Sequence, residues 1–98
     1  MSTPAWFVFH VTIKDHDGLA PYSAEVGETV VAFGGRRILM GGPAAPVEGD
    51  APEGLMVVLE FPDRSTAEAW YNSPAYQAIL GHRLASTTGC AYLVEAAA

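Results

Sequence analysis

Two residues of the chain combine the chemistry of a general base with that of an acid that could orient it, His10 and Glu60. Each lies late in an apolar segment, on the face opposite the largest apolar side chains of that segment. An imidazole that is oriented by a carboxylate can accept a proton near neutral pH. The same two groups could instead satisfy each other as a buried hydrogen-bonded pair at a subunit interface. The sequence leaves both interpretations open.

Several aromatic residues are candidates for lining a ligand pocket. Their rings would give the pocket its shape, and their hydroxyl groups would orient a ligand. Aromatic residues at helical spacing also form hydrophobic cores, and this is the interpretation we favour for Trp70. The hydroxyl groups of Tyr22 and Tyr76 are the more informative ones, because a buried phenol needs a hydrogen-bond partner. The candidates are Tyr22, Trp70, Tyr71 and Tyr76.

Arg83 follows the apolar positions of the last predicted helix, in a chain that has only five basic residues. An arginine at such a position indicates pairing with a carboxylate. That carboxylate belongs either to the chain itself, with Glu60 and Glu25 as candidates, or to a ligand. Arg36 and Arg37 open a short predicted strand, so one of them should face solvent and the other, Arg37 in our assignment, should reach the pocket.

The other reactive side chains give little support for metal or thiol chemistry. The three histidines have no local spacing typical of metal ligands, so we predict no metal site and no cofactor. A single cysteine, Cys90, excludes an internal disulfide, and it most resembles a small buried apolar residue.

Composition narrows the class of protein further. The chain has 98 residues, 50% of them hydrophobic, and a net charge of −6 from 11 acidic and five basic residues. This length predicts one compact domain, 1–98, with an ordered core of about 5–95 and a tail of 96–98. The scarcity of cations argues against nucleic acid and anionic membranes as partners. With no signal-peptide pattern and no apolar run of about 20 residues, we expect a cytoplasmic protein.

The elements that must position these side chains follow from the apolar pattern. Four segments read as strands, and those at 5–13 and 55–61 are largely apolar on both faces. A stripe from Leu19 to Phe33 predicts a helix that ends at a glycine pair. The segment 41–54 is rich in glycine, proline and acids, which indicates a long loop of functional, interface or mobile character. The other two predicted strands are 36–40 and 90–95.

Two further helices are predicted between the third and fourth strands. Ser65 and Glu68 have the spacing of a capping box and would start a short helix through Trp70 and Tyr71. Pro74, capped by Ser73, would start the next one. Tyr76, Ile79, Leu80 and Leu84 would form the inward stripe of that helix, and Gly89 would end it.

The resulting order, β-α-β-β-α-β, predicts an α+β protein of the ferredoxin-like class, with a four-stranded antiparallel sheet and its helices on one face. The strands 5–13 and 55–61 would lie side by side in the centre. Parallel neighbours there would bring His10 close to Glu60. Because the central strands are apolar on both faces, a second copy of the sheet should cover the open one, and we predict a homodimer.

A longer string of residues resembles a known family. Leu55-Met-Val-Val-Leu-Glu-Phe-Pro62 and Ala67-Glu-Ala-Trp-Tyr-Asn-Ser-Pro-Ala-Tyr76 are followed by Arg83, and they are preceded by Phe33-Gly-Gly-Arg-Arg37, Gly41-Gly42 and Val47-Glu-Gly49. Together they resemble the domain of unknown function 1330 family, of the dimeric α/β-barrel superfamily, over about residues 6–95. The resemblance implies a ferredoxin-like dimer and no particular activity. Where family members often have arginine, this chain has Met40 and Leu55, which would favour a more apolar ligand.

Two functional hypotheses follow. The first is a cofactor-independent enzyme of the isomerase, decarboxylase or monooxygenase type that acts on a small organic molecule. In it His10 would be the base, Glu60 its orienting partner, Tyr22 and Tyr76 hydroxyl donors, and Arg83 the partner of an anion. The second is a non-catalytic ligand-binding or stress-related dimeric module, in which the polar residues have structural roles.

Overall fold

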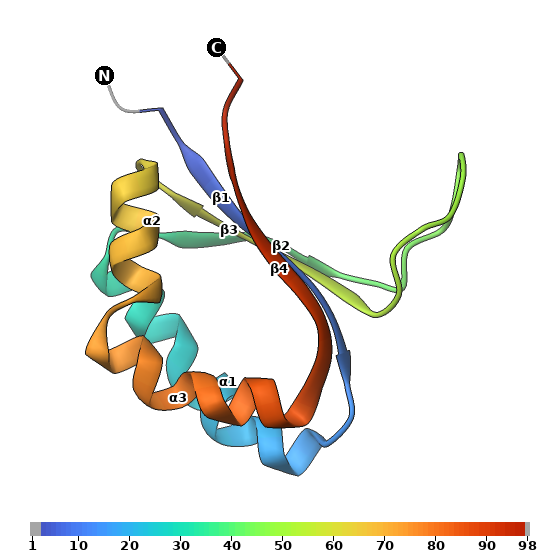
Figure 1. Ribbon diagram of the computed structural model, residues 1–98, viewed down its shortest axis with the longest axis horizontal. Coiled ribbons are helices and arrows are strands. Elements are labelled where there is room, and N and C mark those ends of the chain that lie inside the picture. Colours follow the sequence, from blue (N-terminus) through green and yellow to red (C-terminus); the bar gives the residue numbers. More distant parts are fainter. Residues whose placement is uncertain (1–2, 98) are drawn as a thin grey trace.

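The computed structural model describes residues 3–97, so the first two residues and the last alanine of the predicted tail lie outside it. Three helices pack on one side of a four-stranded sheet (Figure 1). No helix in the described part of the chain is both long and apolar enough to cross a membrane. The elements are, in order, β1 (Ala5–Ile13), α1 (His16–Ala32), β2 (Arg36–Gly41), β3 (Leu55–Phe61), α2 (Arg64–Tyr71), α3 (Pro74–Ser86) and β4 (Thr87–Glu95).

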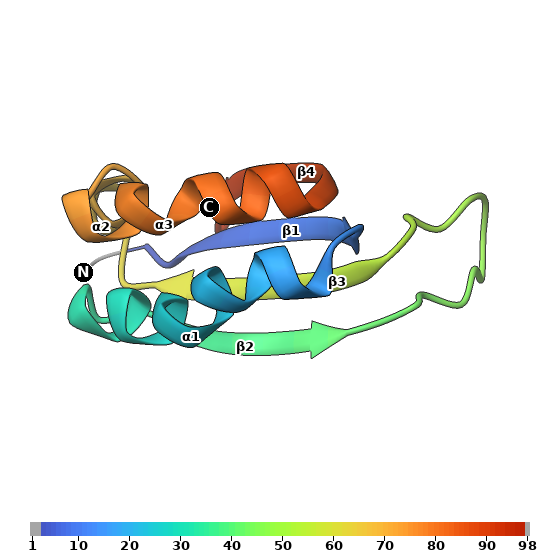
Figure 2. The same cartoon turned by 90° about the horizontal axis from the view of Figure 1, so that it is seen from below.

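The strand order is β2-β3-β1-β4, and every neighbouring pair is antiparallel. This confirms the predicted ferredoxin-like α+β class, with β1 and β3 in the centre. The strand β2 contains a β-bulge between Arg37 and Leu39, after which Met40 pairs with Val57 of β3. The predicted loop 41–54 begins one residue later, because Gly41 belongs to β2, and the segment 42–54 extends well beyond the sheet (Figure 2).

Each of the three helices starts at a side-chain cap. The carboxylate of Asp15 accepts the backbone N–H of Gly18 at 3.0 Å, and Ser73 caps α3 immediately before Pro74. The predicted capping box at Ser65 is wrong. The helix α2 begins two residues earlier, because the side chain of Asp63 accepts the backbone N–H of residue 66 at 2.7 Å.

The junction between α3 and β4 also differs from the prediction. The helix ends at Ser86 and the strand begins at Thr87, so Gly89 lies inside β4 and does not end a helix. Its φ is +139°, and a Cβ atom there would overlap the carbonyl oxygen of His10 on the neighbouring strand. Glycine is therefore required at this position by the close approach of two strands.

The core fills the space between the sheet and the helices, and its largest fully buried side chains are Phe61, Trp70 and Tyr76. On α3, Ile79 and Leu80 are buried as predicted. Leu84 is 61% exposed, however, which corrects the predicted inward stripe. The inward position one turn after Leu80 belongs to Arg83, which is only 8% exposed.

The opposite face of the sheet carries no helix (Figure 1). Because side chains alternate along a strand, His10 and Glu60 both belong to this open face, whereas Phe9 and Leu59 face the helices. Most of the other side chains on the open face are apolar. They are Trp6, Val8, Leu39, Met56, Val58, Tyr92 and Val94.

Candidate functional site

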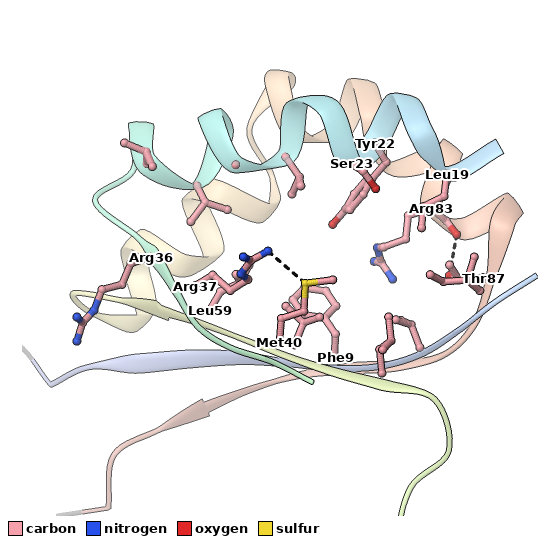
Figure 3. A pocket seen from close by; sticks show the side chains of 18 residues that line it. Phe9, Leu19, Tyr22, Ser23, Arg36, Arg37, Met40, Leu59, Arg83 and Thr87 are labelled. Carbon is pink, nitrogen blue, oxygen red and sulfur yellow. Dashed lines mark hydrogen bonds between the residues drawn. The ribbon is translucent and has the colours of Figure 1, made fainter. Parts of the chain in front are cut away.

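A cavity of about 550 Å³ lies between the helices and the sheet (Figure 3). The elements β1, β2 and β3 form its floor, and α1 and α3 form its walls. Its volume lies within the range of about 300–1,000 Å³ typical of small-molecule sites. Most of the side chains that line it are apolar, including Phe9, Val26, Leu55, Val57 and Leu59.

Arg83 enters this cavity from α3 (Figure 3). Its Cζ atom lies 5.1 Å from the ring centroid of Phe9 and 5.8 Å from that of Tyr22, so the guanidinium group rests against two aromatic faces. Its buried Nε has no hydrogen-bond partner among residues 3–97. Three ion pairs join described residues, and Arg83 belongs to none of them. The predicted pairing of Arg83 with Glu60 or Glu25 is therefore wrong.

Tyr22 and Tyr76 stand next to this arginine, and their hydroxyl oxygens form a hydrogen bond of 2.9 Å. Burial is the main factor that raises the pKa of Tyr22 well above its usual value, and the neighbouring Tyr76 adds to the effect. Burial likewise raises the pKa of Tyr76. Arg83 acts in the opposite direction on both pKa values without reversing either shift. Both phenols are thus neutral at physiological pH.

The charged side chains among the described residues that line the cavity are all positive. Arg37 also lines the cavity, and its Nη1 donates a hydrogen bond of 3.2 Å to the sulfur of Met40. The neighbouring Arg36 reaches the rim, but its guanidinium turns away to Glu60, at 2.9 Å (Figure 3). Among the described residues, the lining contains no aspartate, glutamate or histidine. The cavity therefore offers cationic and hydroxyl donors to a ligand but no anionic acceptor.

The predicted proximity of His10 and Glu60 is wrong. In the register of β1 and β3, His10 pairs with Met56 and Trp6 pairs with Glu60, so the two residues lie at opposite ends of antiparallel strands. The ring of His10 instead forms a 2.9 Å hydrogen bond with the hydroxyl of Tyr92 on β4. Both residues also face away from the cavity. The sheet itself separates His10 from Tyr22 and Arg83.

Glu60 has its own partners on the open face. Its carboxylate accepts a hydrogen bond from Nε1 of Trp6 at 3.0 Å and another from Nε of Arg36 at 3.0 Å. The hydrogen bond from Arg36, followed by that from Trp6, lowers the pKa of this carboxyl. These contacts make Glu60 an anionic link between β1, β2 and β3 and leave it no role in orienting His10.

The structure places Trp70 and Tyr71 in the core and outside the cavity lining. The indole N–H of Trp70 donates to the hydroxyl of Thr29 at 3.0 Å, and its ring centroid lies 4.1 Å from that of Tyr76. Tyr71 packs against Phe7, with ring centroids 5.6 Å apart. Trp70 supports the site indirectly, by fixing the ring of Tyr76 and the position of α1.

Sequence reasoning did not single out Phe9, whose ring lies under the guanidinium of Arg83. Met40 and Leu55 were noted only as positions where family members often have arginine, and the structure places both in the cavity lining. The alternation of apolar residues in β1 was the available signal for Phe9, because it assigns Phe9 and Val11 to the same face.

The fold and the cavity together define an α+β protein of the ferredoxin-like class, with a ligand-sized cavity under its helices. Residues 4–97 match the family described as domain of unknown function (DUF1330), and the chain belongs to this family. This confirms the resemblance seen in the sequence. No curated protein matches the chain.

Three solved structures share the fold. A protein of unknown function from Rhodopseudomonas palustris, RPA0582, is 16% identical with a TM-score of 0.78, over 100% of this chain and 85% of its own. SnoaB, a cofactor-independent oxygenase from Streptomyces nogalater, is 16% identical with a TM-score of 0.59, over 99% and 96% of the two chains. A dimeric protein of unknown function with a ferredoxin-like fold from Bacteroides fragilis is 13% identical with a TM-score of 0.55, over 97% of both chains.

Proposed function

We propose that the protein binds a small organic anion with an apolar body in the cavity between its helices and its sheet. The observation that carries the proposal is Arg83, a buried arginine that faces the cavity without an acidic partner among the described residues. Burying a charge without a counter-charge is costly, so such groups in proteins are normally paired. A carboxylate on the ligand would supply the missing partner and could accept two parallel hydrogen bonds from the guanidinium.

The phenol pair supports the same proposal. In the hydrogen bond between Tyr22 and Tyr76, one hydroxyl donates and the other accepts, which leaves the accepting hydroxyl with a proton to donate elsewhere. Tyr76 is fully buried, whereas Tyr22 lines the cavity. With Tyr76 as the donor of the pair, Tyr22 keeps its own proton free, and a ligand oxygen would receive it together with the donors of Arg83.

Cofactor-independent catalysis is the second candidate function. Arg83 and Tyr22 would stabilise an oxyanion as well as a carboxylate, and preorganised donors of this kind accelerate reactions that develop negative charge on oxygen. SnoaB, which has the same fold, is a cofactor-independent oxygenase. The cavity lining offers no general base among the described residues, so a substrate would have to enter already ionised or carry its own base.

A thermal-shift screen against small carboxylates, phenols, lactones and aldehydes tests the binding proposal. A ligand present at about 100 times its Kd adds about 2.7 kcal/mol to the free energy of unfolding. For a domain of this size, that raises the Tm by about 10 °C or more. We expect carboxylates to give the hits, Arg83→Gln to abolish them, Tyr22→Phe to weaken them and Tyr92→Phe, on the open face, to leave them unchanged. No hit, or hits that survive Arg83→Gln, would disprove the proposal.

The same hits separate binding from catalysis. Each stabilising compound is incubated with the protein in air and analysed by mass spectrometry, with Arg83→Gln as the control. Conversion that depends on Arg83 would support the enzyme hypothesis. Complete recovery of every compound would leave the non-catalytic binding module.

We further propose that the open face of the sheet is the contact surface of a homodimer. This face is largely apolar, and Leu39 and Val94 on it are 45% and 42% exposed. Monomeric proteins rarely expose a contiguous apolar surface of this kind. A structural neighbour with the same fold is dimeric. Light scattering at micromolar concentration should give a dimer for the wild type and for Leu84→Glu on the helix side, but a monomer for Val94→Glu. A monomeric wild type would contradict this proposal.

A further inference from the structure

The four arginines of the chain divide into two pairs with different surroundings. Arg64 bonds to Glu68 and Glu95, and Arg36 bonds to Glu60. The remaining two, Arg37 and Arg83, form no ion pair with any described residue, and both line the same cavity. In a chain with a net charge of −6, the two arginines without an acidic partner are thus both placed around one apolar space.

The two guanidinium groups enter the cavity from opposite sides (Figure 3). Arg83 comes from α3 and is buried, whereas Arg37 comes from the edge strand β2 and is exposed. The side chain of Met40 lies between them in this view, and its sulfur accepts the only hydrogen bond that the side chain of Arg37 donates within the described part of the chain. A thioether is a weak acceptor. An anionic oxygen at this place would be a much better partner for Arg37.

We infer that the ligand carries two acidic groups joined by an apolar spacer. This inference rests on the proposed function, because it takes Arg83 as the site of the first acidic group. One carboxylate binds Arg83 and the hydroxyl of Tyr22 at the buried end. The second binds Arg37 at the exposed end and displaces the sulfur of Met40. The spacer lies on the apolar floor formed by Val57 and its neighbours in β1 and β3.

The floor of the cavity is apolar, so a polar spacer would be unfavourable there. Leu55 and Val57 of β3, and Val11 of β1, offer no hydrogen-bonding side chain. A hydroxyl or amide placed against them would lose its hydrogen bonds to water without replacement. The class of ligand is therefore a diacid with an apolar spacer.

Isothermal titration calorimetry with two matched series of acids tests the inference. The diacids are adipate, suberate, sebacate and dodecanedioate, and the monoacids of equal length are hexanoate, octanoate, decanoate and dodecanoate. At one length the diacid should bind more tightly than its monoacid by about two- to fivefold, as expected for one exposed ion pair. Arg83→Gln should weaken both acids by about tenfold or more.

Two variants assign the second acidic group. Arg37→Gln should remove the preference for the diacid and leave binding of the monoacid unchanged. Arg64→Gln removes the same charge from a distant surface and should preserve the preference. Two results would overturn the inference and leave the proposed function standing. In one, the preference for the diacid survives Arg37→Gln. In the other, the monoacids bind as tightly as the diacids at every length while Arg83→Gln still weakens their binding. If no acid of either series binds, the proposed function fails and the inference fails with it.

Discussion

Replacement of Arg83 by methionine distinguishes a ligand-binding arginine from a structural one. The methionine keeps the unbranched apolar stem and removes the guanidinium. Loss of the buried Nε, which has no hydrogen-bond partner, should favour the folded state by about 1–3 kcal/mol. Loss of the cation–π contacts with Phe9 and Tyr22 should cost about 1–2 kcal/mol in total. The two effects nearly cancel, so we expect the free energy of unfolding to stay within about 1 kcal/mol of the wild type.

The assay is equilibrium unfolding in urea at one fixed protein concentration, followed by tryptophan fluorescence from Trp6 and the buried Trp70. Arg83→Ala serves as the matched control, because it removes the same charge and also leaves the space of the stem empty. The alanine variant should be the less stable of the two. If Arg83→Met lowers the free energy of unfolding by about 3 kcal/mol or more, the arginine belongs to a buried ion pair within the protein. That result would refute the reasoning behind the anion site.

Three other predictions concern stability. Gly89→Ala should lower the free energy of unfolding by at least about 3 kcal/mol, through strain at positive φ and overlap with the adjacent strand. Gly81→Ala, at an open helical position, should raise it by about 0.5–1 kcal/mol. Equal stability of the two variants in urea titrations would contradict this prediction. Thr29→Val should cost about 1–3 kcal/mol, because the buried indole N–H loses its acceptor, and a calorimetric Tm equal to that of the wild type would disagree. The raised pKa values of Tyr22 and Tyr76 predict stability that is complete below about pH 10 and is lost above it, by about 1.4 kcal/mol per pH unit for each phenol. Unfolding curves at alkaline pH should show a smaller loss for Tyr22→Phe, and an unchanged loss would show that this phenol does not contribute.

The period of two along β1 was sufficient to separate the two faces of the sheet from sequence. It placed Phe9 and His10 on opposite faces of the sheet, and the structure agrees. The pairing of His10 with Glu60 failed because it depends on strand direction. An antiparallel register sends residues late in β1 and late in β3 to opposite ends of the sheet. The predicted antiparallel sheet already implies that His10 and Glu60 lie far apart, so the expected proximity of these two residues was inconsistent with it.

The helical period was less decisive for α3. Positions three, four and seven residues after Tyr76 lie on one face, which selects Ile79, Leu80 and Arg83. Hydrophobicity favoured Leu84 instead, which is one position further around the helix. The sequence does not decide between Arg83 and Leu84 at this turn, because which of the two faces inward depends on the cavity. An arginine faces inward there only because the space beneath it is not filled by side chains. That space depends on how α1 sits over β2 and β3, a tertiary distance that no local pattern encodes.

The β-bulge in β2 links the two surfaces of the sheet. Without it, strict alternation from Arg37 would send Leu39 toward the helices and Met40 toward the open face. The extra residue reverses both, so that Leu39 pairs with Val58 and Met40 with Val57. One residue inserted into or deleted from this edge strand would therefore exchange a side chain of the cavity for a side chain of the open face. A single insertion or deletion can thus change both surfaces together, without any substitution in the core.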